Sequence, residues 1–288
     1  MNRRDQILEE IKLVPSLPAS ATEAVSIVRD PNASLTELEA IIECDAGLAT
    51  NILRLANSAY FGGRGSISTV KDATVRLGTK RIVQLVLTTA VAPRIKPPLA
   101  GYDMPSGALL AHSVAAAVGA EQLAQELRLA APDYTYTAGL LHDIGKIVLG
   151  TYLNVEAKPI LDLAFGEGVS FEEAERQVLG IDHAEVGAEL LTWWRLPDDV
   201  VRVVRYHHDP YAIADGDGDG IVTDLVHVGD HIGRLCGTAL GADGVNYSVS
   251  PRSVERLALT PEITESVVGK VLGTLAELGE FFLQTESV

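Results

Sequence analysis

The chain has 288 residues, of which 47% are hydrophobic and 22% are charged, and its formal net charge is −16. This length and composition predict a globular protein with a substantial core and exclude an intrinsically disordered chain. A protein with this much negative charge repels the phosphate backbone, so we expect no non-specific binding to nucleic acid.

Neither a signal peptide nor a membrane-spanning segment is expected. The N-terminus, from Met1 to Asp5, leads into a charged segment, and apolar stretches such as Ile82 to Val91 are far shorter than the roughly 20 residues that cross a bilayer. Cys44 and Cys236 lie far apart in the sequence, which predicts free thiols in a reducing compartment. We therefore expect a soluble, cytoplasmic protein without a membrane partner.

Helix signals occur along nearly the whole chain, and no segment alternates as strands do, so the predicted fold class is all-α. Three pairs fit a helix N-cap followed by a carboxylate three residues later, namely Ser34 with Glu37, Ser170 with Glu173, and Asp182 with Glu185. Gly78 and Gly180 fit the left-handed position that ends a helix, and Pro197 fits the first turn of another.

Two irregular segments separate the predicted helices. The segment Pro93–Gly107 contains four prolines and two glycines, which predicts a boundary between residues 1–100 and residues 101–288. Asp215–Gly220 alternates aspartate and glycine, as at the start of a calcium loop, but Val226 stands where that loop needs a bidentate glutamate. We expect a flexible acidic loop there, and a calcium loop is the alternative.

All seven histidines lie after the predicted boundary. Around His142, a continuous helix would place Ala138, Gly139, Gly145 and Lys146 as neighbours, and three of these are small. His142 is therefore expected on a thin, accessible face. Asp143 would lie at the edge of the apolar face, where an uncompensated carboxylate is unfavourable and a metal ion would compensate it. The alternative is a hydrogen-bonded His-Asp pair in a helix interface.

Other histidines and one aspartate fall where they could converge on the same point. His183 lies in the first turn after Asp182, the pair His207–His208 ends the helix that begins at Pro197, and Asp230 points inward on a helix from Val222 to Cys236. Together with His142 and Asp143 they supply imidazole and carboxylate ligands suited to zinc, iron or manganese. His227 and His231, four residues apart, are an alternative ligand pair.

The chain at this point resembles a known family. The ordered series His112, His142–Asp143, His183, His207–His208 and Asp230 resembles the HD superfamily of metal-dependent phosphohydrolases. The resemblance is greatest to the HDOD branch, the HD-related output domains of bacterial signalling proteins, and it extends from about Val14 to His208. The stretches that carry it are Cys44–Leu48, Leu55–Phe61, Ala73–Gly78 and Leu140–Leu149.

The resemblance implies an N-terminal helical subdomain packed on a C-terminal HD-like helical bundle, with a metal site in the bundle. The implied ligands match those of the HD-GYP cyclic-dinucleotide phosphodiesterases, and they would hold one or two ions of iron, manganese or zinc: His112, His142, Asp143, His183, His207, His208 and Asp230. Asp143 would bridge two cations, and Lys146 would stabilise a phosphate oxygen, so these two are the candidate catalytic residues.

Two functions are compatible with these residues. The favoured one is a signal-transduction output or regulatory module that acts on a signalling protein partner. The alternative is a metal-dependent phosphohydrolase with a nucleotide or phosphate ligand. Asp209-Pro210-Tyr211 replaces the Gly-Tyr-Pro motif of HD-GYP enzymes, which argues against hydrolysis of cyclic di-GMP. Because no sensor or receiver segment is recognised, we expect the signal to arrive through a bound partner.

Overall fold

The computed structural model describes residues 2–29, 35–62, 66–214, 217–238, 241–244 and 246–283. Regular structure in these ranges is helical, and the only pairing of the β type that they contain is an isolated bridge between Leu99 and Met104. The predicted all-α fold class is therefore confirmed. Cys44 and Cys236 are both free thiols. Within these same ranges, no helix combines the length and the apolar character needed to cross a membrane.

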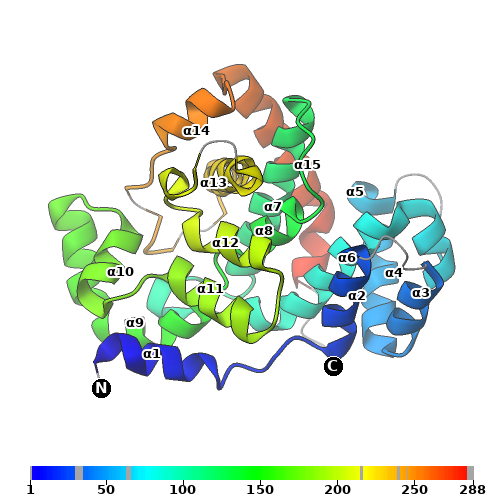
Figure 1. Cartoon of the computed structure of the whole chain (residues 1–288), viewed down its shortest axis with the longest axis horizontal. Helices are drawn as coiled ribbons and strands as arrows, with labels where there is room; N and C mark the ends of the chain where they lie inside the picture. Colours follow the sequence, from blue (N-terminus) through cyan, green and yellow to red (C-terminus); the bar gives the residue numbers. More distant parts are fainter. Residues whose placement is uncertain are drawn as a thin grey trace. The chain divides into compact units, whose positions relative to one another are not determined.

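The chain folds into two compact units (Figure 1). The smaller unit consists of Ser16–Arg94 and Gly273–Val288. Its helices are α2 (Ala19–Arg29), α3 (Leu35–Glu43), α4 (Ala46–Ala56), α5 (Ala59–Gly62) and nearly all of α6 (Val70–Ile95). α15 (Pro261–Leu283) contributes residues to both units. Whether residues 1–100 and 101–288 form separate subdomains remains a prediction.

The larger unit consists of Met1–Pro15 and Ile95–Leu272. Besides the first part of α15, its helices are α1 (Arg3–Ile11), α7 (Ala108–Glu126), α8 (Thr135–Leu141), α9 (Lys146–Leu161), α10 (Phe171–Leu179), α11 (His183–Trp193), α12 (Asp198–Tyr206), α13 (Gly218–Leu235) and α14 (Pro251–Arg256). A π-helical turn at Asp162–Glu167 follows α9. α1 lies along one side of this unit, next to α9 and α11 (Figure 1).

Several helix boundaries follow the predicted local signals. The Asp182 carboxylate accepts a hydrogen bond of 2.8 Å from the backbone N–H of Glu185 and caps α11, and Gly180 ends α10 at φ 77°. Gly78 interrupts α6 at φ 75°, and Pro197 is the N-cap residue of α12 rather than part of its first turn. The N-cap predicted at Ser34 lies outside the described residues.

The cap predicted at Ser170 is wrong in its chemistry. Ser170 does precede α10 in an extended conformation, but its hydroxyl makes no cap hydrogen bond and donates instead to the Glu172 carboxylate at 2.5 Å. A cap would use the hydroxyl oxygen as an acceptor, and the side chain is instead positioned so that its proton reaches the carboxylate two residues away.

α7 is the central helix of the larger unit, because 14 of its 19 residues are buried. α13 packs directly on it. A Cβ atom added at Gly229 of α13 would lie 2.6 Å from the backbone oxygen of Ala116 on α7, so the two helix backbones are in contact there. This close packing fixes the positions of side chains on α7 and α13 relative to each other.

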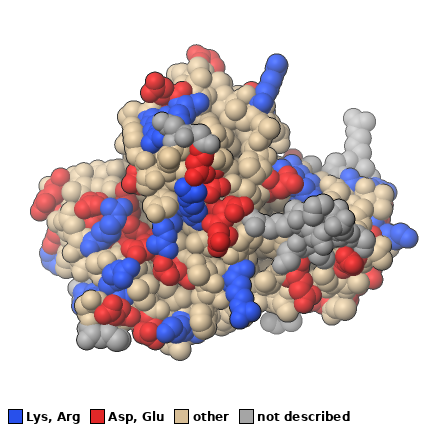
Figure 2. All heavy atoms as spheres, in the orientation of Figure 1, with Lys and Arg blue, Asp and Glu red and all other residues tan. Residues whose placement is uncertain are grey.

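The expected flexible acidic loop is wrong for its described part. Asp217 caps α13 by accepting a hydrogen bond from the Asp219 N–H, and both carboxylates form ion pairs with Arg202, at 2.7 and 3.2 Å. Asp215 lies outside the described residues. Figure 2 shows basic side chains interspersed with acidic ones on the face drawn, and the ion pair between Arg205 and Glu189 is another such pairing in the larger unit.

Candidate metal centre

The larger unit brings all seven predicted ligand residues together. They form two groups, and within each group the possible ligand atoms lie within 4.8 Å of one another. The Asp143 group contains Asp143, His183, His207 and His208, and the Asp230 group contains His112, His142 and Asp230. Six of the seven side chains are buried, and only His208 is partly exposed. The role of these residues as metal ligands remains a prediction.

His142 and Asp143 lie in a turn rather than inside a helix, because α8 ends at Leu141 and α9 begins at Lys146. The small residues around this turn do allow other groups to come close to it, but those groups are neighbouring helices of the same unit. A Cβ atom added at Gly145 would lie 2.0 Å from the backbone oxygen of His183 on α11. The expectation that His142 is accessible is therefore wrong, since the packed helices leave its side chain fully buried.

Four buried histidines share one orientation. In each, Nδ1 is hydrogen-bonded on the outer side: His142 to the Gly139 oxygen at 2.7 Å, His207 to the Val204 oxygen at 2.7 Å, His183 to the Glu175 carboxylate at 2.7 Å, and His112 to the Thr238 hydroxyl at 3.2 Å. The Thr238 hydroxyl donates its own proton to the Gly233 oxygen, so it accepts the proton of His112 Nδ1. Nε2 of each ring therefore faces the centre.

Asp143 lies between the two groups and presents one carboxylate oxygen to each. Its Oδ1 is 3.3 Å from Nε2 of His183 and 4.0 Å from Nε2 of His207, in its own group. Its Oδ2 is 3.4 Å from Nε2 of both His112 and His142, in the Asp230 group. A carboxylate in this position would be shared if each group held a cation, and its Oδ2 also accepts a hydrogen bond of 2.6 Å from Lys146.

Asp230 is held in place by Arg234, one turn further along α13. The guanidinium donates to both Asp230 oxygens at 3.1 Å, while Oδ1 also lies 2.9 Å from Nε2 of His112. The alternative ligand pair of His227 and His231 is disfavoured by the geometry. His227 donates from Nδ1 to the His207 oxygen and accepts the Ser250 N–H at Nε2, so both of its ring nitrogens are engaged.

Lys146 is fully buried, and its ammonium donates to Asp143 at 2.6 Å and to Asp243 at 2.5 Å. Asp243 was not expected from the sequence, because it lies in an irregular segment without a motif. Glu175 was also missed. Its carboxylate accepts hydrogen bonds from the Tyr102 hydroxyl and from both the Nδ1 and the backbone N–H of His183. Arg234 was missed as well, although its spacing of four residues from Asp230 on a helix is a recognisable signal.

The carboxylates of the centre strongly affect the protonation of the histidines. Burial lowers the pKa of His142, but the charges and hydrogen bonds of Asp143 and Asp230 together outweigh burial and raise this pKa to about 9. Burial likewise lowers the pKa of His183, and Glu175 with Asp143 raises it to about 10. Burial and the neighbouring histidines hold the pKa of His207 well below its usual value. Without a metal ion, protons on His142 and His183 thus balance the carboxylate charge.

The residues present fit one or two divalent metal ions. Nε2 of His112, His142 and His207 and Oδ1 of Asp143 are buried atoms that make no well-aligned hydrogen bond among the described residues, although Nε2 of His112 lies 2.9 Å from Asp230 and Oδ1 of Asp143 lies 3.3 Å from Nε2 of His183. Nε2 of His183 lies only 2.8 Å from Nε2 of His208, a distance at which two imidazole nitrogens repel unless a proton or cation lies between them. Inward-facing nitrogens whose opposite ring N–H groups are held by outer acceptors are typical of metal-binding histidines.

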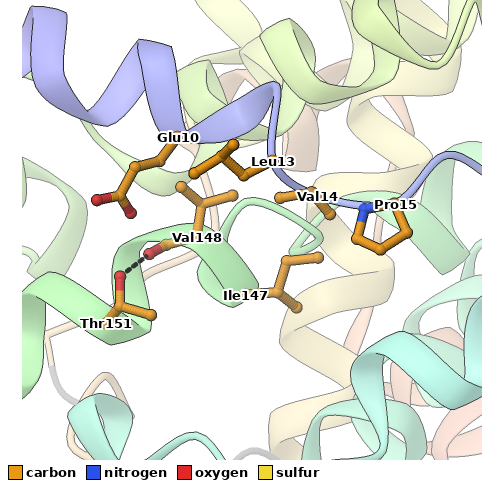
Figure 3. Close-up of a pocket in the computed structure, with 7 residues that line it drawn as sticks. All are labelled: Glu10, Leu13, Val14, Pro15, Ile147, Val148 and Thr151. Carbon is orange, nitrogen blue, oxygen red and sulfur yellow. Dashed lines mark hydrogen bonds between the residues drawn. The ribbon is translucent and has the colours of Figure 1, made fainter.

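A surface pocket of about 290 Å³ lies apart from this centre, between α1 and α9 (Figure 3). It is lined by Glu10, Leu13, Val14, Pro15, Ile147, Val148 and Thr151. Ile147 and Val148 directly follow Lys146 in the sequence, but the buried Lys146 does not line the pocket, and neither do the seven predicted ligands.

The chain is similar to several known proteins. The family described as HDOD domain matches residues 14–210. An uncharacterized protein of Treponema pallidum (strain Nichols) is 25% identical over 213 residues, which are 72% of this chain and 40% of the relative, so the chain spans well under half of that protein.

Solved structures of similar fold include an HDOD domain protein of unknown function from Geobacter sulfurreducens, with a TM-score of 0.70, 25% identity, and coverage of 98% of this chain and 95% of that one. A candidate signal transduction protein from Marinobacter aquaeolei VT8 has a TM-score of 0.70 and 23% identity over 96% of this chain and 60% of that one. A candidate phosphohydrolase from Shewanella amazonensis SB2B has a TM-score of 0.58 and 23% identity over 92% of this chain and 97% of that one.

Proposed function

The chain belongs to the HDOD domain family, and on this basis we propose that it is a signal-transduction output module whose larger unit contains a binuclear metal site. In this proposal the metal site stabilises the arrangement of helices that a partner protein recognises. The description of the Marinobacter aquaeolei VT8 protein as a candidate for signal transduction is consistent with this role.

The orientation of the four buried histidines is the observation that carries the metal site. Each Nδ1 is hydrogen-bonded on the outside, and each Nε2 points towards Asp143 or Asp230. A packed histidine without a metal ion normally has a hydrogen-bond partner for both nitrogens, because a buried polar atom without one is unfavourable by roughly 1–3 kcal/mol. His227 is such a histidine in this same unit, since both of its nitrogens are engaged.

The charges of the centre also favour cations. Among the described residues, four buried carboxylates in and next to the centre, Asp143, Glu175, Asp230 and Asp243, are accompanied by the permanently charged Lys146 and Arg234, so without a metal ion the remaining negative charge is balanced by protons on His142 and His183. The Asp143 group would hold one ion and the Asp230 group a second, with Asp143 shared. A divalent ion bound there would supply positive charge to a phosphoryl oxygen and lower the pKa of a bound water.

A metal-dependent phosphohydrolase is the second candidate function, and the position of Asp143 between the two groups favours it. The described structure favours it less than the signalling role, because the site is buried and the Lys146 ammonium is bonded to two carboxylates. The described part of the acidic segment Asp215–Gly220 does not decide between the two functions, because Asp217 and Asp219 are paired with Arg202.

Elemental analysis tests the proposed metal site. Protein prepared without chelators is expected to contain one to two equivalents of iron, manganese or zinc. The matched comparison is between His207→Ala, which removes an inward-facing nitrogen, and His227→Ala, which removes a histidine of the same unit whose nitrogens are both engaged. Metal content should fall in the first variant and not in the second. Less than one equivalent in the unaltered protein would refute the metal site.

A further inference from the structure

The irregular segment between α13 and α14 covers the metal centre. Its described residues are 236–238, 241–244 and 246–250, and the last two stretches carry Asp243 and Tyr247. The segment is fixed to the rest of the larger unit at three points. The Ala242 N–H donates to the Tyr102 oxygen at 2.7 Å, the Asn246 amide donates to the Val169 oxygen at 3.2 Å and to the Ala164 oxygen, and the Ser250 N–H donates to His227 at 2.9 Å.

Asp243 of this segment is fully buried beside Lys146. Its Oδ2 accepts from the Lys146 ammonium, whereas its Oδ1 has no hydrogen-bond partner among the described residues. A buried carboxylate oxygen without a donor is unfavourable. The ion pair between Oδ2 and Lys146 must therefore offset the unfavourable free energy of burying Oδ1 of Asp243.

Tyr247 links the same segment to both ligand groups. Its ring stacks on His208 with centroids 5.2 Å apart, and the guanidinium of Arg234 lies 3.7 Å from its centroid. Arg234 in turn holds Asp230 and donates to the backbone oxygen of Asp243 at 3.3 Å. The Tyr247 hydroxyl is a second buried polar atom without a partner among the described residues. Asp243 is the one buried residue among the described residues of 241–250, and the two buried atoms without partners add nothing to the hold on this segment.

We propose that Asp243 occupies the anion position on Lys146, so that Asp243 and Tyr247 keep a phosphate-containing ligand out of the metal centre until they are displaced. The inference rests on the proposed metal-binding function and adds its regulation. A carboxylate and a phosphate both accept charge-assisted hydrogen bonds from an ammonium group, so they compete for Lys146. Displacement of the segment would also release Tyr247 from His208 and Arg234, which couples anion binding to both ligand groups.

The test measures binding of inorganic phosphate by calorimetry to the full chain, with metal content determined on the same samples. Asp243→Ala is expected to bind phosphate about tenfold or more tightly than the unaltered protein, because one charge-assisted competitor is removed. Ser248→Ala, an exposed position in the same segment, is the matched control and should behave like the unaltered protein. Adding Lys146→Met to Asp243→Ala should abolish the gain.

Asn246→Ala provides an independent test, because it loosens the segment without changing the charges around Lys146. It should also strengthen phosphate binding, and it replaces Asp243→Ala if that variant does not fold by circular dichroism. Equal phosphate affinity in the unaltered protein and in the folded variants would overturn the role of Asp243. Metal content below one equivalent, with phosphate binding still increased in Asp243→Ala, would instead contradict the proposed metal site and leave the competition for Lys146 supported.

Discussion

Replacement of Glu175 by glutamine should weaken metal binding without unfolding the protein. Glu175 does not face the metal centre directly. Its carboxylate accepts hydrogen bonds from His183 Nδ1 at 2.7 Å, from the His183 N–H at 2.9 Å and from the Tyr102 hydroxyl at 2.5 Å. Glutamine retains an oxygen acceptor of the same shape for His183 but loses the negative charge, and hydrogen bonds to a neutral acceptor are roughly half as strong.

The expected loss of affinity is about 10- to 100-fold, the range typical when the outer partner of a metal-binding histidine is changed. At about 1.36 kcal/mol per tenfold change, this corresponds to roughly 1.4–2.7 kcal/mol of binding free energy. Competition with a chelator of known affinity would measure it. Glu173→Gln is the matched control on the same helix, because the Glu173 side chain is 42% exposed and pairs with Arg176 rather than with His183.

The metal-free protein supplies a second measurement on the same variant. The negative charge of Glu175 is the largest influence that offsets burial and raises the pKa of His183, so this pKa should fall in Glu175→Gln. The imidazole resonances in NMR spectra would report the change. An affinity within about twofold of the unaltered protein, in a variant with unchanged circular dichroism, would show that Glu175 does not orient a metal ligand.

Three further predictions follow from the centre. In metal-free protein the pKa values of His142 and His183 are about 9 and about 10, above the ordinary value of 6.5. The stability that these two protonated histidines give the folded state should therefore be complete below about pH 6.5 and be lost as the pH rises through 9 to 10, which thermal unfolding at a series of pH values measures. Metal-loaded protein should instead lose its metal on acidification. Gly145→Ala should lower the free energy of unfolding by about 1–3 kcal/mol or more, because its Cβ atom would lie 2.0 Å from a backbone oxygen. Gly150→Ala, whose Cβ atom would have no neighbour nearer than 3.6 Å, should not lower it, and urea unfolding of the two variants measures the difference. Manganese- or iron-loaded protein should turn over cyclic di-GMP far below the usual enzyme range of about 1–1000 per second, and a rate within that range that Asp143→Ala abolishes would establish the phosphohydrolase function.

Local signals in the sequence predicted those features that depend on neighbouring residues. The Asp182 cap and the end of α10 at Gly180 are such features, because cap hydrogen bonds join residues a few positions apart. The burial of His142 could not be predicted in this way. The sequence pattern predicts one continuous helix, whereas the chain turns between Leu141 and Lys146 and α11 packs against Gly145.

Some residues of the centre could be predicted from the sequence and others could not. Their order in the chain resembles a known ligand series, so the seven candidates could be named from the sequence, and the structure places them together. Glu175 and Asp243 could not be named, because they reach the centre from a separate amphipathic helix and from an irregular segment. Their contacts with His183 and Lys146 depend on tertiary packing, which the hydrophobic periodicity of a sequence does not predict.

Burial of the ligand residues has a consequence for the rate of metal exchange. The residues of the Asp230 group are at most 3% exposed, and Tyr247 stacks on the partly exposed His208 of the Asp143 group. An ion can then leave only when the protein opens locally, so the release rate should be set by that opening rather than by the strength of the incoming chelator. The rate of chelator-driven metal release should therefore reach a plateau as the chelator concentration rises. Conditions that raise this plateau rate should also raise the rate at which the amide hydrogens of residues 241–244 and 246–250 exchange with solvent.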